Sequence, residues 1–221
     1  MAFWHWKKSK FTSPSFIEGD TEGFWTWFRQ NESALWPVFT AVFEGSEGDD
    51  AANDALAAAL TKFHPGLVFE VGRAQDGLLD LVISADGDFS RFPAVLELVG
   101  KSQTSKKFIV TAFRQRRAGL SLSIHGEEFQ DETVRFHMLP SQSHDGKFDL
   151  TIFMGQSSLD SEQLARAAFI LLDTTIGEYD METLIGAVEV CRSPPASDGQ
   201  LLPLSELPRI LDEGLLLRTQ H

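Results

Sequence analysis

The sequence predicts an α+β protein whose helices pack on one face of a mainly antiparallel sheet. Three observations favour this class. Apolar residues recur at helical spacing in some segments and alternate with polar residues in others. These two kinds of segment are grouped along the chain in a way typical of α+β folds. Apolar residues make up 43% and charged residues 23% of the chain, which is usual for a folded globular protein.

Helices are predicted where apolar side chains follow a period of about 3.6 residues. The first helix begins near Asp20 or Thr21, because either side chain can cap free backbone N–H groups. It places Trp27 and Phe28 on a buried face, and Pro37 is expected to interrupt it. Further helices are predicted over 50–63, 89–100, 161–176 and 204–211.

Strands alternate with these helices, and part of their order occurs twice. Residues 76–83 and 145–152 share five of eight positions, and each octet enters the second strand of a predicted hairpin. A strand–strand–helix–strand order therefore covers both 67–113 and 133–190, which we interpret as a duplication with Asp80 and Asp149 at equivalent positions. The alternative is coincidence, because Asp-Gly turns before apolar strands are common.

The chain length of 221 residues favours one domain, which we assign to residues 20–221. Residues 1–19 are assigned to a basic, aromatic N-terminal tail. Its aromatic residues and lysines are suited either to weak contact with an anionic membrane surface or to packing against the rest of the chain. These residues are Phe3, Trp4, Trp6, Lys7, Lys8, Lys10 and Phe11. No apolar stretch is long enough for a transmembrane segment.

The net charge of −13 disfavours nucleic acid as a partner, because an acidic surface repels phosphate groups. Another protein is the expected partner. Cys191 is the only cysteine, so no intrachain disulfide forms, and a reducing cytoplasm is the expected location. Cys191 ends an apolar run, so we interpret it as a small buried residue rather than a nucleophile.

Common catalytic and nucleotide-binding motifs are missing from the sequence, which has no Walker loop, no dinucleotide fingerprint and no nucleophile elbow. No cofactor and no metal are therefore expected. An alternative is a hydrolase-like enzyme with a carboxylate-rich cleft, in which Arg114 and Tyr179 join the acids. The acids in question are Glu70, Asp80, Asp86 and Asp88.

A small basic cluster flanks the strand predicted over 108–113. It consists of Lys106, Lys107, Arg114, Arg116 and Arg117. Because we expect this strand to be interior to the sheet, its end would present these cations, with Tyr179, to an anion or to an acidic segment of a partner. Two alternatives are a solvated turn and an inward-facing Arg114 that pairs with an acid such as Glu70 or Asp180.

Several blocks of the sequence resemble an uncharacterised family of small acidic bacterial cytoplasmic proteins. These blocks are Phe-Trp-Thr-Trp-Phe-Arg-Gln-Asn-Glu (24–32), Pro-Gly-Leu-Val-Phe-Glu (65–70), Leu-Val-Ile-Ser-Ala-Asp-Gly (81–87), Thr-Ala-Phe-Arg (111–114) and Leu-Leu-Asp-Thr-Thr-Ile-Gly-Glu-Tyr-Asp (171–180). The resemblance implies a bacterial cytoplasmic α+β protein and carries no activity. The sequence therefore favours a non-enzymatic interaction protein, such as an inhibitor or immunity-type protein, over the hydrolase-like alternative.

Overall fold

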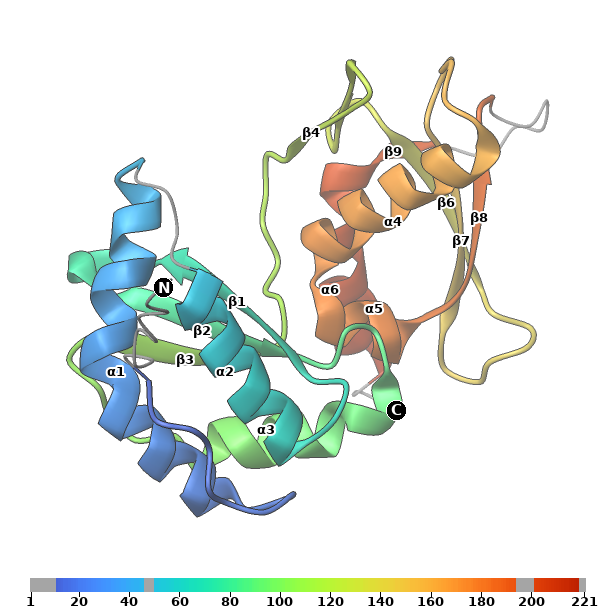
Figure 1. Cartoon of the computed structure of the whole chain (residues 1–221). Coiled ribbons are helices and arrows are strands. Elements are labelled where there is room, and N and C mark those ends of the chain that lie inside the picture. Colours follow the sequence, from blue (N-terminus) through green and yellow to red (C-terminus); the bar gives the residue numbers. More distant parts are fainter. Residues whose placement is uncertain (1–10, 46–49, 194–200, 219–221) are drawn as a thin grey trace. The chain divides into compact units, whose positions relative to one another are not determined.

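The computed structural model describes residues 11–45, 50–193 and 201–218, and the chain contacts divide it into two units (Figure 1). Unit 1 extends to Phe113 and unit 2 begins at Arg114. The sequence analysis treats 20–221 as one domain, whereas each of the two units has a hydrophobic core of its own. The division falls directly after the first of the two repeated segments.

The described residues of unit 1 form three α-helices and a three-stranded sheet with the order β1-β2-β3. Strand β1 is antiparallel to β2, and β3 is parallel to β2. The elements are α1 (Thr21–Phe43), α2 (Asp50–Phe63), β1 (Val68–Arg73), β2 (Leu79–Ser84), α3 (Phe92–Gly100) and β3 (Phe108–Ala112). Short 3-10 turns lie at Gln75–Gly77 and Phe89–Arg91.

Unit 2 contains a two-stranded sheet, β4-β5, and a four-stranded sheet with the order β8-β7-β6-β9. Its strands are β4 (Ser121–Ile124), β5 (Glu127–Gln130), β6 (Arg135–Pro140), β7 (Phe148–Phe153), β8 (Ile185–Cys191) and β9 (Leu202–Pro203). Its helices are α4 (Ser161–Ile176), α5 (Glu178–Leu184) and α6 (Leu207–Arg218), with a 3-10 turn at Leu204–Glu206. The predicted α+β class is confirmed, although the strands of the described residues form three sheets instead of one.

Side-chain alternation shows which face of each main sheet meets the helices. In unit 1, Leu81 and Ile83 of β2 belong to the same core as the helices, whereas Asp80 lies on the opposite face. In unit 2, Leu150 and Ile152 of β7 are buried in the core formed with the helices. Each main sheet therefore has one face covered by its own helices, as the sequence predicts.

Both units have the strand order that the repeat hypothesis predicts, and the duplication itself stays a prediction. In each unit an antiparallel hairpin is followed by a helical crossover to a strand parallel to the second hairpin strand. Asp80 and Asp149 are both the second residue of the central strand. Each carboxylate accepts a hydrogen bond from the parallel neighbour: Asp80 from the Thr111 hydroxyl at 2.6 Å, and Asp149 from the Ala187 N–H at 2.9 Å.

Helix α1 begins as predicted and continues past its proline. The Asp20 carboxylate accepts a hydrogen bond from the Gly23 N–H at 2.9 Å and caps the helix. The prediction that Pro37 interrupts this helix is wrong. An interior proline costs about 3 kcal/mol, but Leu35 and Phe39 beside it are buried, and their packing offsets that cost.

Residues 11–16 pack against α1, which agrees with the alternative that the N-terminal segment packs against the rest of the chain. Phe11 and Phe16 are buried in the core of unit 1. Asn31 accepts a hydrogen bond from the Thr12 N–H at 2.9 Å and donates one to the Thr12 hydroxyl at 2.8 Å. The predicted membrane contact by residues 1–10 lies outside the described residues. Within the described part of the chain, no helix has the length and apolar character that crossing a bilayer requires.

Candidate functional site

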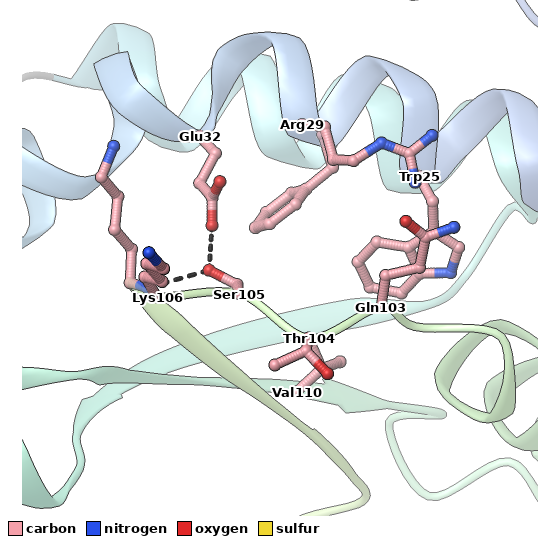
Figure 2. A pocket seen from close by; sticks show the side chains of 10 residues that line it. Trp25, Arg29, Glu32, Gln103, Thr104, Ser105, Lys106 and Val110 are labelled. Carbon is pink, nitrogen blue, oxygen red and sulfur yellow. Dashed lines mark hydrogen bonds between the residues drawn. The ribbon is translucent and has the colours of Figure 1, made fainter.

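A cavity of about 360 Å3 lies in unit 1 between α1 and the segment that leads into β3 (Figure 2). Trp25, Phe28 and Val110 supply its apolar surface. Trp25 is fixed by a hydrogen bond from its indole N–H to the Leu98 carbonyl at 2.8 Å, and the Phe28 ring packs edge-on against Phe108. The apolar floor is therefore rigid, which favours binding because little side-chain freedom is lost.

Ser105 organises the polar edge of this cavity (Figure 2). Its Oγ accepts hydrogen bonds from the N–H groups of Lys107 and Phe108, at 2.9 and 3.0 Å. The same hydroxyl donates to the carboxylate of Glu32 on α1. This chain of hydrogen bonds holds the start of β3 next to α1 and engages Glu32, the acid among the lining residues.

Three cations surround the same cavity. Arg29 and Lys106 are exposed, and Lys107 donates a hydrogen bond from Nζ to the Ser33 hydroxyl at 2.7 Å. Arg29 contacts the Thr26 hydroxyl at 3.0 Å. With three cations against one carboxylate, the cavity carries a local positive charge in a chain of net charge −13. An apolar floor and a cationic rim suit a ligand that combines apolar groups with carboxylates.

The strand beside this cavity lies at an edge of its sheet. The sequence analysis places the 108–113 strand in the sheet interior, and that prediction is wrong. A crossover through α3 brings β3 alongside β2, and among the described residues no further strand pairs with β3. The edge position leaves one side of β3 next to the cavity that Val110 helps to line.

The predicted basic cluster is divided between the units. Lys106 and Lys107 belong to unit 1, and the three arginines belong to unit 2. Arg114 turns inward, as in the alternative considered for it, but its guanidinium pairs with Asp173 at 2.9 Å. The Arg114 N–H also donates to the fully buried carboxylate of Glu178 at 3.2 Å, and the Glu178 N–H returns a hydrogen bond to the Arg114 carbonyl at 3.0 Å.

Carboxylates also pair with the guanidinium group of Arg116. Its guanidinium pairs with Asp180 and makes a two-pronged contact to Asp212, with both N–O distances at 2.9 Å. Arg117 is exposed and donates its N–H to the Thr174 carbonyl at 2.8 Å, while Tyr179 is half-exposed on α5. The guanidinium groups of Arg114 and Arg116 already form salt bridges with carboxylates of unit 2. These two arginines therefore stabilise unit 2 and carry no part of our functional proposal.

The Arg116–Asp212 contact gives unit 2 an acid-sensitive interaction. Hydrogen bonds from Arg116 lower the pKa of Asp212 below its usual value of 3.8. A carboxyl group with a depressed pKa stabilises the folded state above its unfolded pKa and loses that contribution as the pH falls through the folded value. Arg116→Gln is therefore expected to weaken the fall in unit 2 stability below about pH 4. Urea unfolding at several pH values, with Arg135→Gln as the control, measures this; an unchanged pH slope in Arg116→Gln would contradict it.

Three of the four acids of the hydrolase-like alternative make contacts within the sheet or a turn. Asp80 binds Thr111, and Asp88 caps a 3-10 turn and pairs with Arg91 at 3.0 Å. Asp86 occupies a turn in which its N–H donates to the Ser84 hydroxyl at 2.9 Å. Glu70 lies on the same sheet face as Asp80, two pairs further along the β1–β2 ladder. In the described residues, no three His, Cys, Asp or Glu side chains are grouped so that they could hold a metal ion.

Cys191 lies at the end of β8 and is half-buried. Burial raises the pKa of its thiol, and the nearby charge of Glu189 raises it further. A raised pKa keeps the sulfur protonated at neutral pH and makes Cys191 a poor nucleophile, although its side chain is not fully buried as expected.

The sequence analysis identifies Lys106 and Lys107 but misses most of the cavity. The missed residues are Trp25, Phe28, Arg29, Glu32, Gln103, Thr104, Ser105 and Val110. Arg29 and Glu32 follow directly after an aromatic stripe, and that juxtaposition is the sequence signal for the cavity. Searches of family models, curated proteins and solved structures find no match to this chain.

Proposed function

We propose that this protein is a non-enzymatic binding protein that captures an acidic segment of a partner protein in the cavity between α1 and β3. The observation that carries the proposal is the combination of a fixed apolar floor, Trp25 and Phe28, with a cationic rim. The three cations act at short range, because salt screens charges beyond about 8 Å at physiological ionic strength. The negative charge of the rest of the chain therefore does not prevent an acidic segment from binding locally.

Protein is favoured over nucleic acid as the partner. Nucleic-acid sites use long tracts of cations that follow a phosphate backbone. Here the three cationic side chains lie around one cavity of an acidic chain. The single cysteine fits a reducing compartment, so we place this binding function in the cytoplasm, and the resemblance noted above suggests a bacterial one.

A displayed library of random linear peptides tests the proposal. The full chain is expected to select peptides rich in Asp and Glu with an apolar residue among the acids. The double variant Arg29→Glu/Lys106→Glu is expected to bind the selected peptides at least about tenfold more weakly, which corresponds to about 1.4 kcal/mol. The matched control is Arg135→Glu/Arg166→Glu, which makes the same change in net charge on exposed residues of unit 2.

The proposal fails if the library yields no acidic peptides. It also fails if the control variant loses as much affinity as Arg29→Glu/Lys106→Glu, because a general charge effect would then explain the binding. Isothermal titration at two salt concentrations gives the affinities, and binding should weaken as salt rises.

A further inference from the structure

We infer that the bound segment adds to β3 as a fourth strand of the β1-β2-β3 sheet. This inference rests on the proposed function and specifies how the partner is recognised. Edge strands carry a row of unpaired backbone groups and accept extended peptides by forming main-chain hydrogen bonds. Among the described residues, β3 is the outer strand on its side of the sheet, and it borders the apolar, cationic cavity.

The hydrogen bonds of β3 show which backbone groups face outward. The Leu79 N–H donates to the Lys107 carbonyl at 2.9 Å, and the Phe113 N–H donates to the Ile83 carbonyl at 2.8 Å. Backbone groups alternate in direction along a strand, so the residues at 107, 109, 111 and 113 face β2, and those at 108, 110 and 112 face away. Because Ser105 Oγ already accepts the Phe108 N–H, Val110 is the position that presents its N–H to an added strand.

Side-chain directions then define what the added segment should contain. Val110 points toward the core and the cavity, whereas Ile109 points to the opposite sheet face and is 45% exposed. Alternate residues of an added strand would therefore meet different surfaces. One set faces Trp25, Phe28 and the cations, and the other set lies beside Ile109.

These two surfaces predict an alternating partner sequence. The residues toward α1 are expected to be acidic around one apolar side chain, because the cavity has a cationic rim and an apolar floor. The residues beside Ile109 are expected to be β-branched or aromatic, since these make the most favourable cross-strand pairs. The lysines at the start of β3 repel the same basic edge of a second copy of this chain. They attract an acidic segment of a partner instead.

Val110→Pro tests strand addition directly. Proline removes the outward N–H of residue 110 without removing a hydrogen bond to β2, and edge strands tolerate proline. The matched control is Val110→Ala, which shortens the same side chain and keeps the N–H. The acidic peptides selected above are expected to bind Val110→Pro about tenfold more weakly than Val110→Ala, an effect of the size of one backbone hydrogen bond.

A second measurement keeps the test independent of the fold of the proline variant. Peptides N-methylated at single positions should lose affinity for the unaltered chain at every second position, and the Val110 amide should exchange more slowly when peptide is bound. Equal binding to both Val110 variants, with no alternation among N-methylated peptides, would overturn strand addition while leaving acidic-segment binding intact. A dimer that Val110→Pro converts to monomer without peptide would instead assign the edge to a second copy of this chain.

Discussion

Replacing Trp27 with alanine is expected to lower the free energy of unfolding of unit 1 by about 3–5 kcal/mol, as for other large buried aromatic residues. Trp27 is 4% exposed and lies in an aromatic cluster beside Phe24. Its indole N–H also donates to the Thr12 carbonyl at 2.6 Å, so the substitution removes one of the hydrogen bonds that tie residues 11–16 to α1. A cavity and an unpaired carbonyl both follow from the change.

Tryptophan fluorescence in urea measures this effect. The tryptophans that the structure describes, Trp25, Trp27 and Trp36, lie in unit 1, and the sequence of unit 2 contains none, so the emission of these residues follows unit 1. Ile17→Ala is the control, because Ile17 is 75% exposed and its loss should change the midpoint little. A midpoint that is the same in Trp27→Ala and the unaltered chain would show that the buried α1 face contributes little to stability.

Gly177→Ala is expected to destabilise unit 2 by about 3 kcal/mol or more, the upper end of what backbone strain alone costs. Gly177 lies between α4 and α5 at φ 79° and ψ 155°, a conformation that is essentially restricted to glycine. A Cβ there would lie 3.0 Å from the Arg114 carbonyl oxygen and 3.2 Å from the Arg116 nitrogen. Both contacts are with backbone, so neither can be relieved by a side-chain rotation.

Gly155→Ala separates strain from steric contact. Gly155 also has a positive φ, 83°, but a Cβ there would meet nothing within 4 Å. We expect this control to cost about 1 kcal/mol. Hydrogen exchange of α4 amides reports the stability of unit 2 in each variant. Equal losses of stability in the two variants would mean that the close approach of the Arg114–Arg116 backbone adds nothing to the cost of Gly177→Ala.

Much of the helical structure could be predicted because helices depend on local spacing and capping. The predicted bounds of α2 and α4 agree with the structure, and α4 has the Asp160–Gln163 capping box that marks such a start. Helix α5 was not predicted. It is a single short helix whose residues Glu178 and Leu184 are buried, so tertiary packing and not local periodicity holds it.

Strand neighbours were harder to predict than strands. The two octets lie in the hairpins β1–β2 and β6–β7, but the interior position expected for β3 is wrong. Whether a strand after a crossover lies inside a sheet depends on whether a later segment pairs with its free side. In this chain the next strands, β4 and β5, pair with each other instead.

The candidate site could be predicted only in part for the same reason. Charge indicated Lys106 and Lys107, because lysines stand out in an acidic chain. Trp25 and Phe28 appeared as ordinary core residues of an amphipathic helix. Their second role arises because the segment before β3 passes along α1, and that contact joins parts of the chain that are distant in sequence.

The mixed pairing of the central strands has a consequence for the order in which each unit assembles. Strands β2 and β7 each pair with the preceding strand through a short turn and with the following strand across a whole helix. The longer connection carries the larger chain-closure entropy, so hairpins β1–β2 and β6–β7 should gain amide protection before β3 and β8 during refolding. Strand β3 would then also be the first strand of its sheet to open from the native state. Because this opening is local, the edge that we assign to partner binding can fluctuate while the rest of unit 1 stays folded.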